Sequence, residues 1–302
     1  MMSTLPSIND YHLPNLDFIS LLGIGGMSTV WKARQVSLDR LVAVKVLSRE
    51  LAANQEDRDR FIQEARACAA LDHPGIMRVY DVASYQNTFY IVMELIDGYT
   101  MGQWLRRKTH LDSDDVLIIL ESIAYALDYA WQTARVVHCD IKPDNIMIDQ
   151  DGTVKVTDMG LAQSLATTVQ TATQEEVIGT PAYISPEQAC GETNLDCRSD
   201  IYSLGATLYH LLVGHTLFPN LSSDLTLNAH VQPDTQAPDI RSEIPGVSDS
   251  FARVLAKMLA KDRRDRYADW RELIDDIKRL YAGEPAATNL SHPFISSMQL
   301  NS

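Results

Sequence analysis

The spacing of hydrophobic residues changes near position 95 and divides the chain into two unlike parts. In the first part, residues 41–47 and 88–93 are rich in β-branched and aromatic side chains, which is typical of strands. A further strand is expected at residues 30–33. Residues 57–70 instead gather their apolar side chains on one face of a helix. The pattern therefore predicts a strand-rich region that one helix interrupts.

After residue 98 the hydrophobic positions recur with a helical period. Three helices are expected, at residues 112–130, 201–212 and 270–281. Asp112 stands at the start of the first, and its carboxylate is expected to cap that helix by accepting backbone N–H groups. The second part of the chain is therefore predicted to be mostly helical.

The two ends of the chain lack this periodicity, because polar residues and prolines dominate there. The whole pattern predicts an α+β fold with two lobes. The expected organisation is a flexible lead-in at 1–14, a strand-rich lobe at 15–95, a connection at 94–98, a helical lobe at 99–281 and a polar tail at 282–302.

Composition is that of a globular protein, with 45% apolar and 22% charged residues. No apolar run reaches the roughly 18 to 20 residues that span a bilayer, and the N-terminus does not look like a secretory signal. The four cysteines lack C-x-x-C spacing, which argues against a zinc ribbon or a disulfide framework. These features favour a cytoplasmic location, or the cytosolic face of a membrane if a longer parent chain exists.

The formal net charge of −14 argues against a nucleic-acid partner, because phosphate backbones are bound by Lys and Arg surfaces. An acidic surface is compatible with a basic peptide substrate, although such a surface more often only maintains solubility. Charge alone leaves these two interpretations open.

Residues 138–147 hold the strongest candidate chemistry. Asp140 and Asn145 stand five positions apart with Lys142 between them, and Asp158 follows 18 positions after Asp140. Asp and Asn in a loop are most often turn residues. An acid, a cation and an amide at these spacings, however, suit phosphoryl transfer from ATP. The segment resembles the protein-kinase catalytic loop, His-Arg-Asp-x-x-x-x-Asn, which is followed by Asp-Phe-Gly.

A glycine-rich segment near the N-terminus suits phosphate binding, because glycine lets backbone N–H groups approach a phosphate. Taken alone, Gly-x-Gly is most often only a turn. A strand follows it rather than a helix, which disfavours a dinucleotide-binding fingerprint, and the absence of Gly-Lys-Ser/Thr excludes a Walker A loop. The candidate nucleotide-binding residues here are Leu22, Gly23, Ile24, Gly25, Gly26, Met27, Ser28, Thr29 and Val30.

Residues 18–281 as a whole resemble the bacterial eukaryotic-like serine/threonine protein kinases. Three motifs are close to those of that branch, and they occur in the family's order: Gly-x-Gly-Gly-Met-x-x-Val, His-Pro-Gly-Ile and Ala-Lys-Asp-x-x-x-Arg-Tyr. The resemblance implies the bilobal protein-kinase fold, with an antiparallel-sheet N-lobe, one main N-lobe helix and a mostly helical C-lobe. It also implies ATP with Mg²⁺, or with Mn²⁺ in its place, and a protein substrate.

Strand alternation puts Ala43 and Lys45 on one face of residues 41–47, opposite the valines. By the resemblance, Ala43 would cover the adenine and Lys45 would meet the phosphates, with Glu64 as the ion-pair partner that orients Lys45. The connection between the lobes would bind adenine through backbone groups. The implied adenine contacts are Met93, Glu94, Ile96 and Met147.

The resemblance also assigns catalytic roles. Asp140 would accept or orient the substrate hydroxyl, and Lys142 would neutralise charge on the transferring phosphoryl group. Asn145 and Asp158 would hold magnesium as oxygen ligands. Thr180 would bridge the base and the lysine, as in serine/threonine kinases. The Asp-x-Lys-x-x-Asn spacing is also of that type, whereas tyrosine kinases carry Ala-Ala-Arg or Arg-Ala-Ala in this interval.

Three further residues are implied to hold the scaffold. Glu187, in a Ser-Pro-Glu that replaces the usual Ala-Pro-Glu, should pair with Arg266. Asp200 should accept backbone N–H groups of the catalytic loop. Such buried contacts are expected to affect stability and activity together.

The sequence departs from the family pattern at four positions: Ser28, Cys139, Met159 and Ser185. Cys139 matters most, because the usual arginine there binds a phosphorylated activation loop. Residues 156–197 contain neither Lys nor Arg, and Gln163 stands where a second cation is often found. We therefore hypothesise a kinase that does not depend on activation-loop phosphorylation. The loop threonines concerned are Thr167, Thr168, Thr171 and Thr173.

Two other functions stay open at this point. A pseudokinase that binds nucleotide and acts as a scaffold is disfavoured, because it would have no chemical need for all the catalytic residues. A small-molecule kinase is disfavoured by residues 179–187, which dock a peptide in the resembling family. The sequence does not identify the substrate, the activating signal or the oligomeric state.

Overall fold

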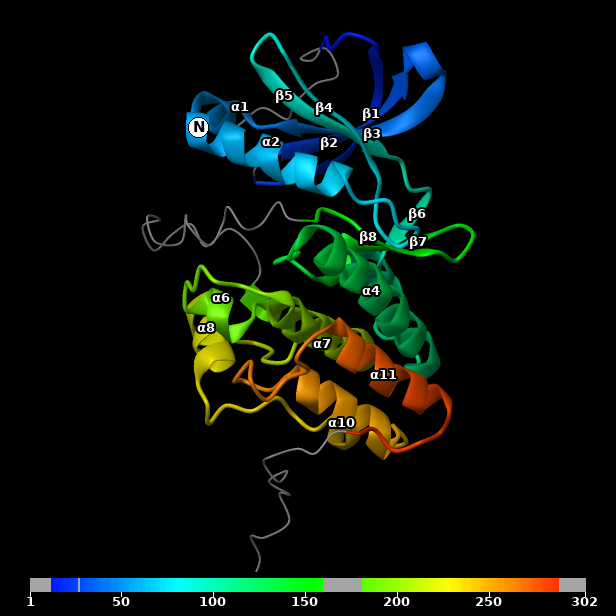
Figure 1. The fold of residues 1–302 in the computed structure, drawn as a ribbon, viewed down its shortest axis with the longest axis vertical. Coiled ribbons are helices and arrows are strands. Elements are labelled where there is room, and N and C mark those ends of the chain that lie inside the picture. Colours follow the sequence, from blue (N-terminus) through cyan, green and yellow to red (C-terminus); the bar gives the residue numbers. More distant parts are fainter. Residues whose placement is uncertain (1–11, 27, 160–180, 288–302) are drawn as a thin grey trace, which may run out of the picture.

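The computed structural model describes residues 12–26, 28–159 and 181–287. Figure 1 shows two lobes, one built on a sheet with helices against it and one built mainly from helices. The expected α+β, two-lobed architecture is confirmed by this arrangement.

The N-lobe is a five-stranded antiparallel sheet with the strand order β1-β2-β3-β5-β4. Strands β3 and β5 lie at its centre and correspond to the two runs of β-branched and aromatic residues. The elements of this lobe are β1 (Leu16–Ile24), β2 (Ser28–Gln35), the 3-10 turn η2 (Val36–Leu38), β3 (Arg40–Leu47), α1 (Arg49–Ala53), α2 (Gln55–Ala69), β4 (Val79–Tyr85) and β5 (Thr88–Glu94).

The two faces of the N-lobe sheet carry separate apolar cores. Val42, Val44 and Val46 of β3 pack with Trp31 of β2 on one face. On the other side, residues of α1 and α2, Phe61 among them, pack against the sheet. Because successive strand residues face opposite ways, Lys45 of β3 lies on the face opposite the three valines. The alternation predicted from the sequence therefore places Lys45 toward α2 and the interior of the molecule.

The C-lobe surrounds helix α7, most of whose residues are buried. Helices α4, α10 and α11 contact each other or α7 in Figure 1, and a small three-stranded sheet lies beside α4 toward the N-lobe. The elements are β6 (Gly98–Thr100), α3 (Met101–Lys108), α4 (Ser113–Ala134), η3 (Pro143–Asn145), β7 (Ile146–Asp149), β8 (Val154–Val156), η4 (Pro181–Tyr183), α6 (Pro186–Ala189), α7 (Cys197–Val213), α8 (Ser223–Val231), α9 (Ile240–Glu243), α10 (Asp249–Met258) and α11 (Trp270–Tyr281).

Helix starts follow local capping, and one expectation about them was wrong. Asp112 is the N-cap residue of α4, but its side chain makes no capping hydrogen bond. Helix α2 begins two residues earlier than expected because the Asn54 side chain accepts the N–H of Glu56. Strands β1, β4 and β6 and helix α3 were not specifically expected, since their hydrophobic patterns are short or irregular.

The two lobes are joined by main-chain hydrogen bonds beside the connecting segment. Met77 N–H donates to Val156 O of β8 at 2.9 Å, and Val156 N–H donates to Gly75 O at 2.8 Å. A Cβ on Gly75 would lie 3.2 Å from Cβ of Ala126 in α4, so only glycine allows this close approach without adjustment. The segment that leads from α2 to β4 is therefore held against the C-lobe.

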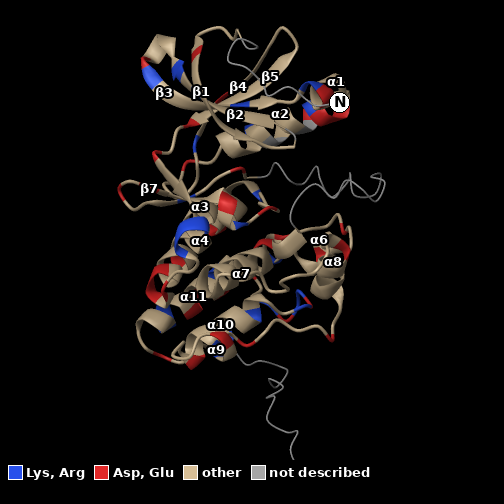
Figure 2. Ribbon diagram, turned by 180° about the vertical axis from the view of Figure 1, so that it is seen from behind, with Lys and Arg blue, Asp and Glu red and all other residues tan. Residues whose placement is uncertain are grey.

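Acidic residues are distributed over both lobes, as Figure 2 shows, in keeping with the excess of 40 acidic over 26 basic residues. Within the described ranges, no helix has both the length and the apolar character needed to cross a membrane.

Candidate active site

The loop at residues 138–142 is fixed by a carboxylate from the core of the C-lobe. Asp200 of α7 accepts the backbone N–H of His138 at 2.7 Å and that of Cys139 at 2.8 Å, which is the contact expected from the sequence. Burial raises the pKa of Asp200 to about 6, although these two N–H groups and His138 act in the opposite direction. The loop is therefore positioned by a buried group on a rigid helix.

Cys139 adopts a left-handed backbone conformation with φ of 64°. A non-glycine residue held there costs about 1 to 3 kcal/mol, and the surrounding contacts must offset this cost. Its carbonyl oxygen accepts Nε2 of Gln188 from α6 at 2.7 Å. Cys139 as a whole is 8% exposed, and its side chain packs with Val137, Trp131 and Leu195. Cys139 therefore occupies an apolar environment.

Asp140, Lys142 and Asn145 converge at one point of this loop. Lys142 Nζ lies 2.7 Å from Asp140 Oδ2, and Asn145 Nδ2 donates to the same oxygen at 2.8 Å. Asn145 Nδ2 also donates to the Asp140 carbonyl oxygen at 2.8 Å. The Asp140 side chain remains 35% exposed, so the carboxylate is not sealed off by these contacts.

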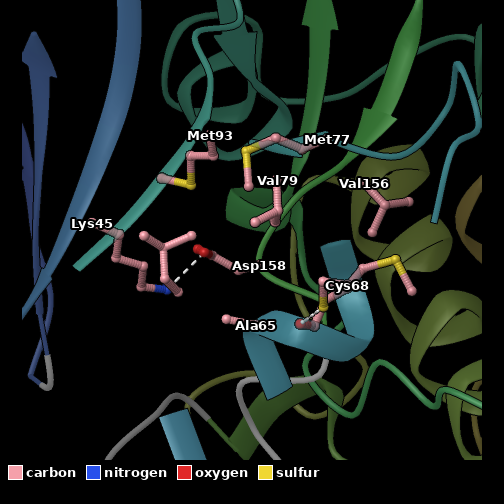
Figure 3. Close-up of a pocket in the computed structure, with 10 residues that line it drawn as sticks. Lys45, Ala65, Cys68, Met77, Val79, Met93, Val156 and Asp158 are labelled. Carbon is pink, nitrogen blue, oxygen red and sulfur yellow. Dashed lines mark hydrogen bonds and ion pairs between the residues drawn. The ribbon is translucent and has the colours of Figure 1, made fainter. Parts of the chain in front are cut away.

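Asp158 and Lys45 come from different lobes and form an ion pair at 2.7 Å (Figure 3). Burial alone would raise the pKa of Asp158, but the charge and hydrogen bond of Lys45, with His138 and Lys142, hold this pKa below its ordinary value. Asp158 is also in the left-handed region with φ of 56°. The site thus keeps an ionised carboxylate and a lysine ammonium in direct contact.

A small pocket, partly open to solvent, adjoins this ion pair. Figure 3 shows Lys45 and Asp158 at one side of it and the thioether of Met93 nearby. Cys68 Sγ of α2 donates to Met159 O at 2.8 Å across one wall. The lining residues are Lys45, Ala65, Cys68, Met77, Val79, Ile91, Met93, Val156, Asp158 and Met159.

Asn145 and Asp158 fit a magnesium ion. The two hydrogen bonds from Asn145 Nδ2 identify Oδ1 as the amide atom that can face a cation. Thr157 N–H donates to Asn145 O at 2.9 Å, so the chain segments carrying the two ligands lie side by side. Mg²⁺ usually takes one or two protein oxygens and completes its shell with water and phosphate. In the described part of the chain no cluster of three or more His, Cys, Asp or Glu forms a separate metal centre.

The segment that connects the lobes begins at Glu94, the last residue of β5. Met93 and Ile96 are 5% and 9% exposed, so this segment is packed on its inner side. The Glu94 carboxylate contacts Lys155 Nζ at 2.8 Å and the backbone N–H of Arg78 at 3.2 Å. Sequence reasoning identified Glu94 but missed both partners.

Glu187 and Arg266 form the expected buried pair. Arg266 Nη1 and Nη2 lie 2.8 and 2.9 Å from the two carboxylate oxygens, and Ser199 Oγ donates to Glu187 Oε1 at 2.6 Å. Burial would raise the pKa of Glu187, but Arg266 holds it below its ordinary value. Ser185 begins α6 in a capping box with Gln188, a Ser-x-x-Gln signature that was visible in the sequence.

Several residues implied by the sequence lie outside the described part of the chain. These are Met27, Gln163, Thr167, Thr168, Thr171, Thr173 and Thr180. Glu64 lies in α2, but its side chain is also outside that part, so its expected pairing with Lys45 stays a prediction.

Comparison with known proteins gives a consistent result. The protein kinase domain family matches residues 16–279. The serine/threonine-protein kinase PknB of Mycobacterium leprae is 38% identical over 288 residues, covering 94% of this chain and 45% of that protein. The serine/threonine-protein kinase PrkC of Bacillus subtilis is 38% identical over 263 residues, covering 87% and 40% respectively. The chain therefore spans less than half the length of these curated relatives.

Among solved structures, the PknI kinase domain of Mycobacterium tuberculosis is similar, with a TM-score of 0.71 and 28% identity. The match covers 91% of this chain and 99% of that domain, so both lobes are included.

Proposed function

The chain belongs to the protein kinase domain family, and from this premise we propose that it transfers the γ-phosphoryl group of ATP to Ser or Thr hydroxyls of protein substrates. The observation that carries the proposal is the convergence of Asp140, Lys142 and Asn145, together with the Lys45–Asp158 pair, whose carboxylate also feels the charge of Lys142. Relatives that match nearly the whole chain are named serine/threonine kinases. The net charge of −14 is compatible with a basic substrate surface.

Each residue has a separate role that follows from its place in the site. Asp140 accepts or orients the attacking hydroxyl, and Lys142, already in contact with Asp140, neutralises charge on the transferring group. Lys45 exchanges Asp158 for the nucleotide phosphates. Asn145 and Asp158 would hold Mg²⁺, which screens the phosphate charge when bound. The backbone of residues 94–96 would hydrogen-bond the adenine, with Ala43 and Met147 against the ring.

The proposal predicts magnesium-dependent transfer to Ser and Thr. The protein is incubated with γ-labelled ATP and a generic basic protein, and the labelled amino acids are identified. Label should appear on Ser or Thr, not on Tyr, and should be lost on chelation and restored by Mg²⁺. Mn²⁺ in place of Mg²⁺ tests metal preference.

A pseudokinase would instead bind nucleotide without transferring phosphate. Binding of ADP with no labelled product under any metal would support this alternative and contradict the proposal. Retention of the three contacts around Asp140 is the reason that active transfer is favoured.

We also propose that the active geometry does not require activation-loop phosphorylation. The catalytic-loop backbone is hydrogen-bonded to the side chains of Asp200 and Gln188, which both belong to C-lobe helices. The Cys139 side chain lies in an apolar cluster and offers no cation to a phosphate. A phosphate adds about −1.5 to −2 charge and needs such a partner to order a loop.

Replacing Thr167, Thr168, Thr171 and Thr173 together by alanine should therefore leave peptide phosphorylation nearly unchanged. The measurement is kcat/KM for a peptide substrate, determined for the alanine variant and for phosphatase-treated wild type and compared in each case with untreated wild-type protein. A loss greater than about tenfold, ~1.4 kcal/mol in barrier, would contradict independence from loop phosphorylation.

A further inference from the structure

A second ion pair lies where the two lobes join, away from the transferring phosphoryl group. Glu94 Oε1 contacts Lys155 Nζ of β8 at 2.8 Å, while Glu94 Oε2 accepts the backbone N–H of Arg78 at 3.2 Å. The backbone N–H of Glu94 also donates to Arg78 O at 2.9 Å. The first residue of the connecting segment is therefore held by the C-lobe on one side and by the start of β4 on the other.

Both anchors are themselves fixed. Arg78 follows the segment that is hydrogen-bonded to Val156 and packed on α4 through Gly75. Lys155 stands next to Val156 and pairs in the β7–β8 ladder with Met147, an implied adenine contact. The Glu94 carboxylate thus contacts two pieces of backbone that are also hydrogen-bonded to each other through Val156, so its position is fixed from both sides.

The ion pair is largely shielded from water. The side chains of Lys155 and Glu94 are 12% and 23% exposed, whereas most surface pairs in this chain have at least one much more exposed partner. Shielding makes a pair more sensitive to loss of one member, because the remaining charge stays partly desolvated. Removing Lys155 should therefore let the Glu94 carboxylate turn toward water and carry its backbone with it.

We propose that Lys155 is a positioning residue for nucleotide binding: through Glu94 it aligns the backbone of residues 94–96 with the adenine. This inference rests on the proposed function, because it assigns adenine to that backbone. Lys155 acts at the base end of the nucleotide, whereas Lys45 acts at the phosphate end. The pair therefore contributes to ground-state nucleotide affinity and leaves the chemical step unchanged.

Lys155→Met removes the charge and keeps the length of the side chain. It should raise KM for ATP about tenfold while kcat stays within about twofold. This pattern is expected when the ground state and the transition state lose the same binding energy. Calorimetric binding of adenosine and of ADP should weaken by the same factor, because both ligands share the base. Lys155→Arg keeps the ion pair and should bind both ligands like wild type.

Lys257→Met is the matched control. Lys257 pairs with Glu272 on α10 and α11 at 2.6 Å, and its side chain is 14% exposed, close to the value for Lys155. The same substitution at this distant pair should leave adenosine binding unchanged. If Lys155→Met does not fold, Glu94→Gln keeps an acceptor for Arg78 N–H, removes the charge, and should weaken adenosine and ADP equally.

Three results would overturn the inference: unchanged adenosine affinity in a folded Lys155→Met protein, weakened ADP binding with normal adenosine binding, or equal weakening in Lys257→Met. Failure of the proposed function looks different, because the wild-type protein itself would then transfer no phosphate. Wild-type transfer with normal nucleotide binding in Lys155→Met would reject only the role of Lys155.

Discussion

Asp140→Asn is expected to reduce kcat by about a thousandfold while ATP binding stays at the wild-type level. Asparagine retains one oxygen that can accept Lys142 Nζ and Asn145 Nδ2, the two donors to Asp140 Oδ2. The loop should therefore keep its geometry and lose only the carboxylate charge that accepts or orients the hydroxyl proton. Initial rates with saturating ATP and peptide measure kcat, and calorimetry with ADP measures nucleotide affinity.

Asp151→Asn is the control for this substitution. Asp151 is an exposed carboxylate in the turn between β7 and β8, and its replacement should change neither kcat nor nucleotide affinity. A variant of Asp140 that keeps more than about a tenth of the wild-type kcat would exclude it as the catalytic carboxylate, since removal of a positioned base typically costs a hundredfold or more.

Arg266→Ala is expected to give the largest loss of stability, about 3 to 5 kcal/mol, which corresponds to a melting temperature lower by about 10 °C. The Arg266 side chain is fully buried and contacts both oxygens of Glu187. It also donates to the carbonyl oxygens of Ala260, Arg198 and Lys261. Alanine leaves the Glu187 charge buried without its main partner. Thermal unfolding followed by circular dichroism measures the effect, and activity should fall with stability.

The pH dependence of this variant tests the cause. In the wild type, Arg266 lowers the pKa of Glu187, so the contribution of Glu187 is present at neutral pH and is lost as the pH falls through that pKa. Without Arg266, burial raises the pKa of Glu187. The folded variant then binds the proton of Glu187 more tightly than the unfolded variant does. The loss of unfolding free energy relative to wild type should therefore become smaller as the pH falls toward about 5.

Arg264→Ala provides the comparison two residues away. Arg264 pairs with Asp262 at the surface and its side chain is 83% exposed, so the melting temperature should change by no more than about 2 °C. Equal losses in the two variants, or a stable but inactive Arg266→Ala, would contradict the scaffold role of Arg266.

Local pattern predicted much of the fold and part of the site. The alternation that separates Lys45 from the neighbouring valines is a property of any strand, and the structure places Lys45 against Asp158 accordingly. The period of helices α4 and α11 was equally visible, because each buries one continuous apolar face. The pairing of Glu187 with Arg266, 79 positions apart, came instead from resemblance to a family.

Two features of the site and one helix cap were beyond sequence reasoning. Cysteine has no intrinsic preference for the left-handed region, so the conformation of Cys139 follows from contacts with Asp200 and Gln188 that are distant in the chain. Lys155 and Glu94 are common residues 61 positions apart, and no local signal pairs them. Asp112 had the right residue type for a cap but lacks the hydrogen bond, since capping depends on a side-chain rotamer that the sequence does not specify.

The direct contact between Lys45 and Asp158 has a thermodynamic consequence for nucleotide loading. If Lys45 binds a phosphate and Asp158 binds a cation, as proposed above, each gives up its contact with the other. If only one exchange occurs, the abandoned partner is left in a shielded cleft without its counter-charge. When both exchanges occur together, the phosphate takes the place of Asp158 beside Lys45, and the metal cation takes the place of Lys45 beside Asp158. Nucleotide and metal should therefore enhance each other's affinity reciprocally, and the ion pair sets the size of that linkage.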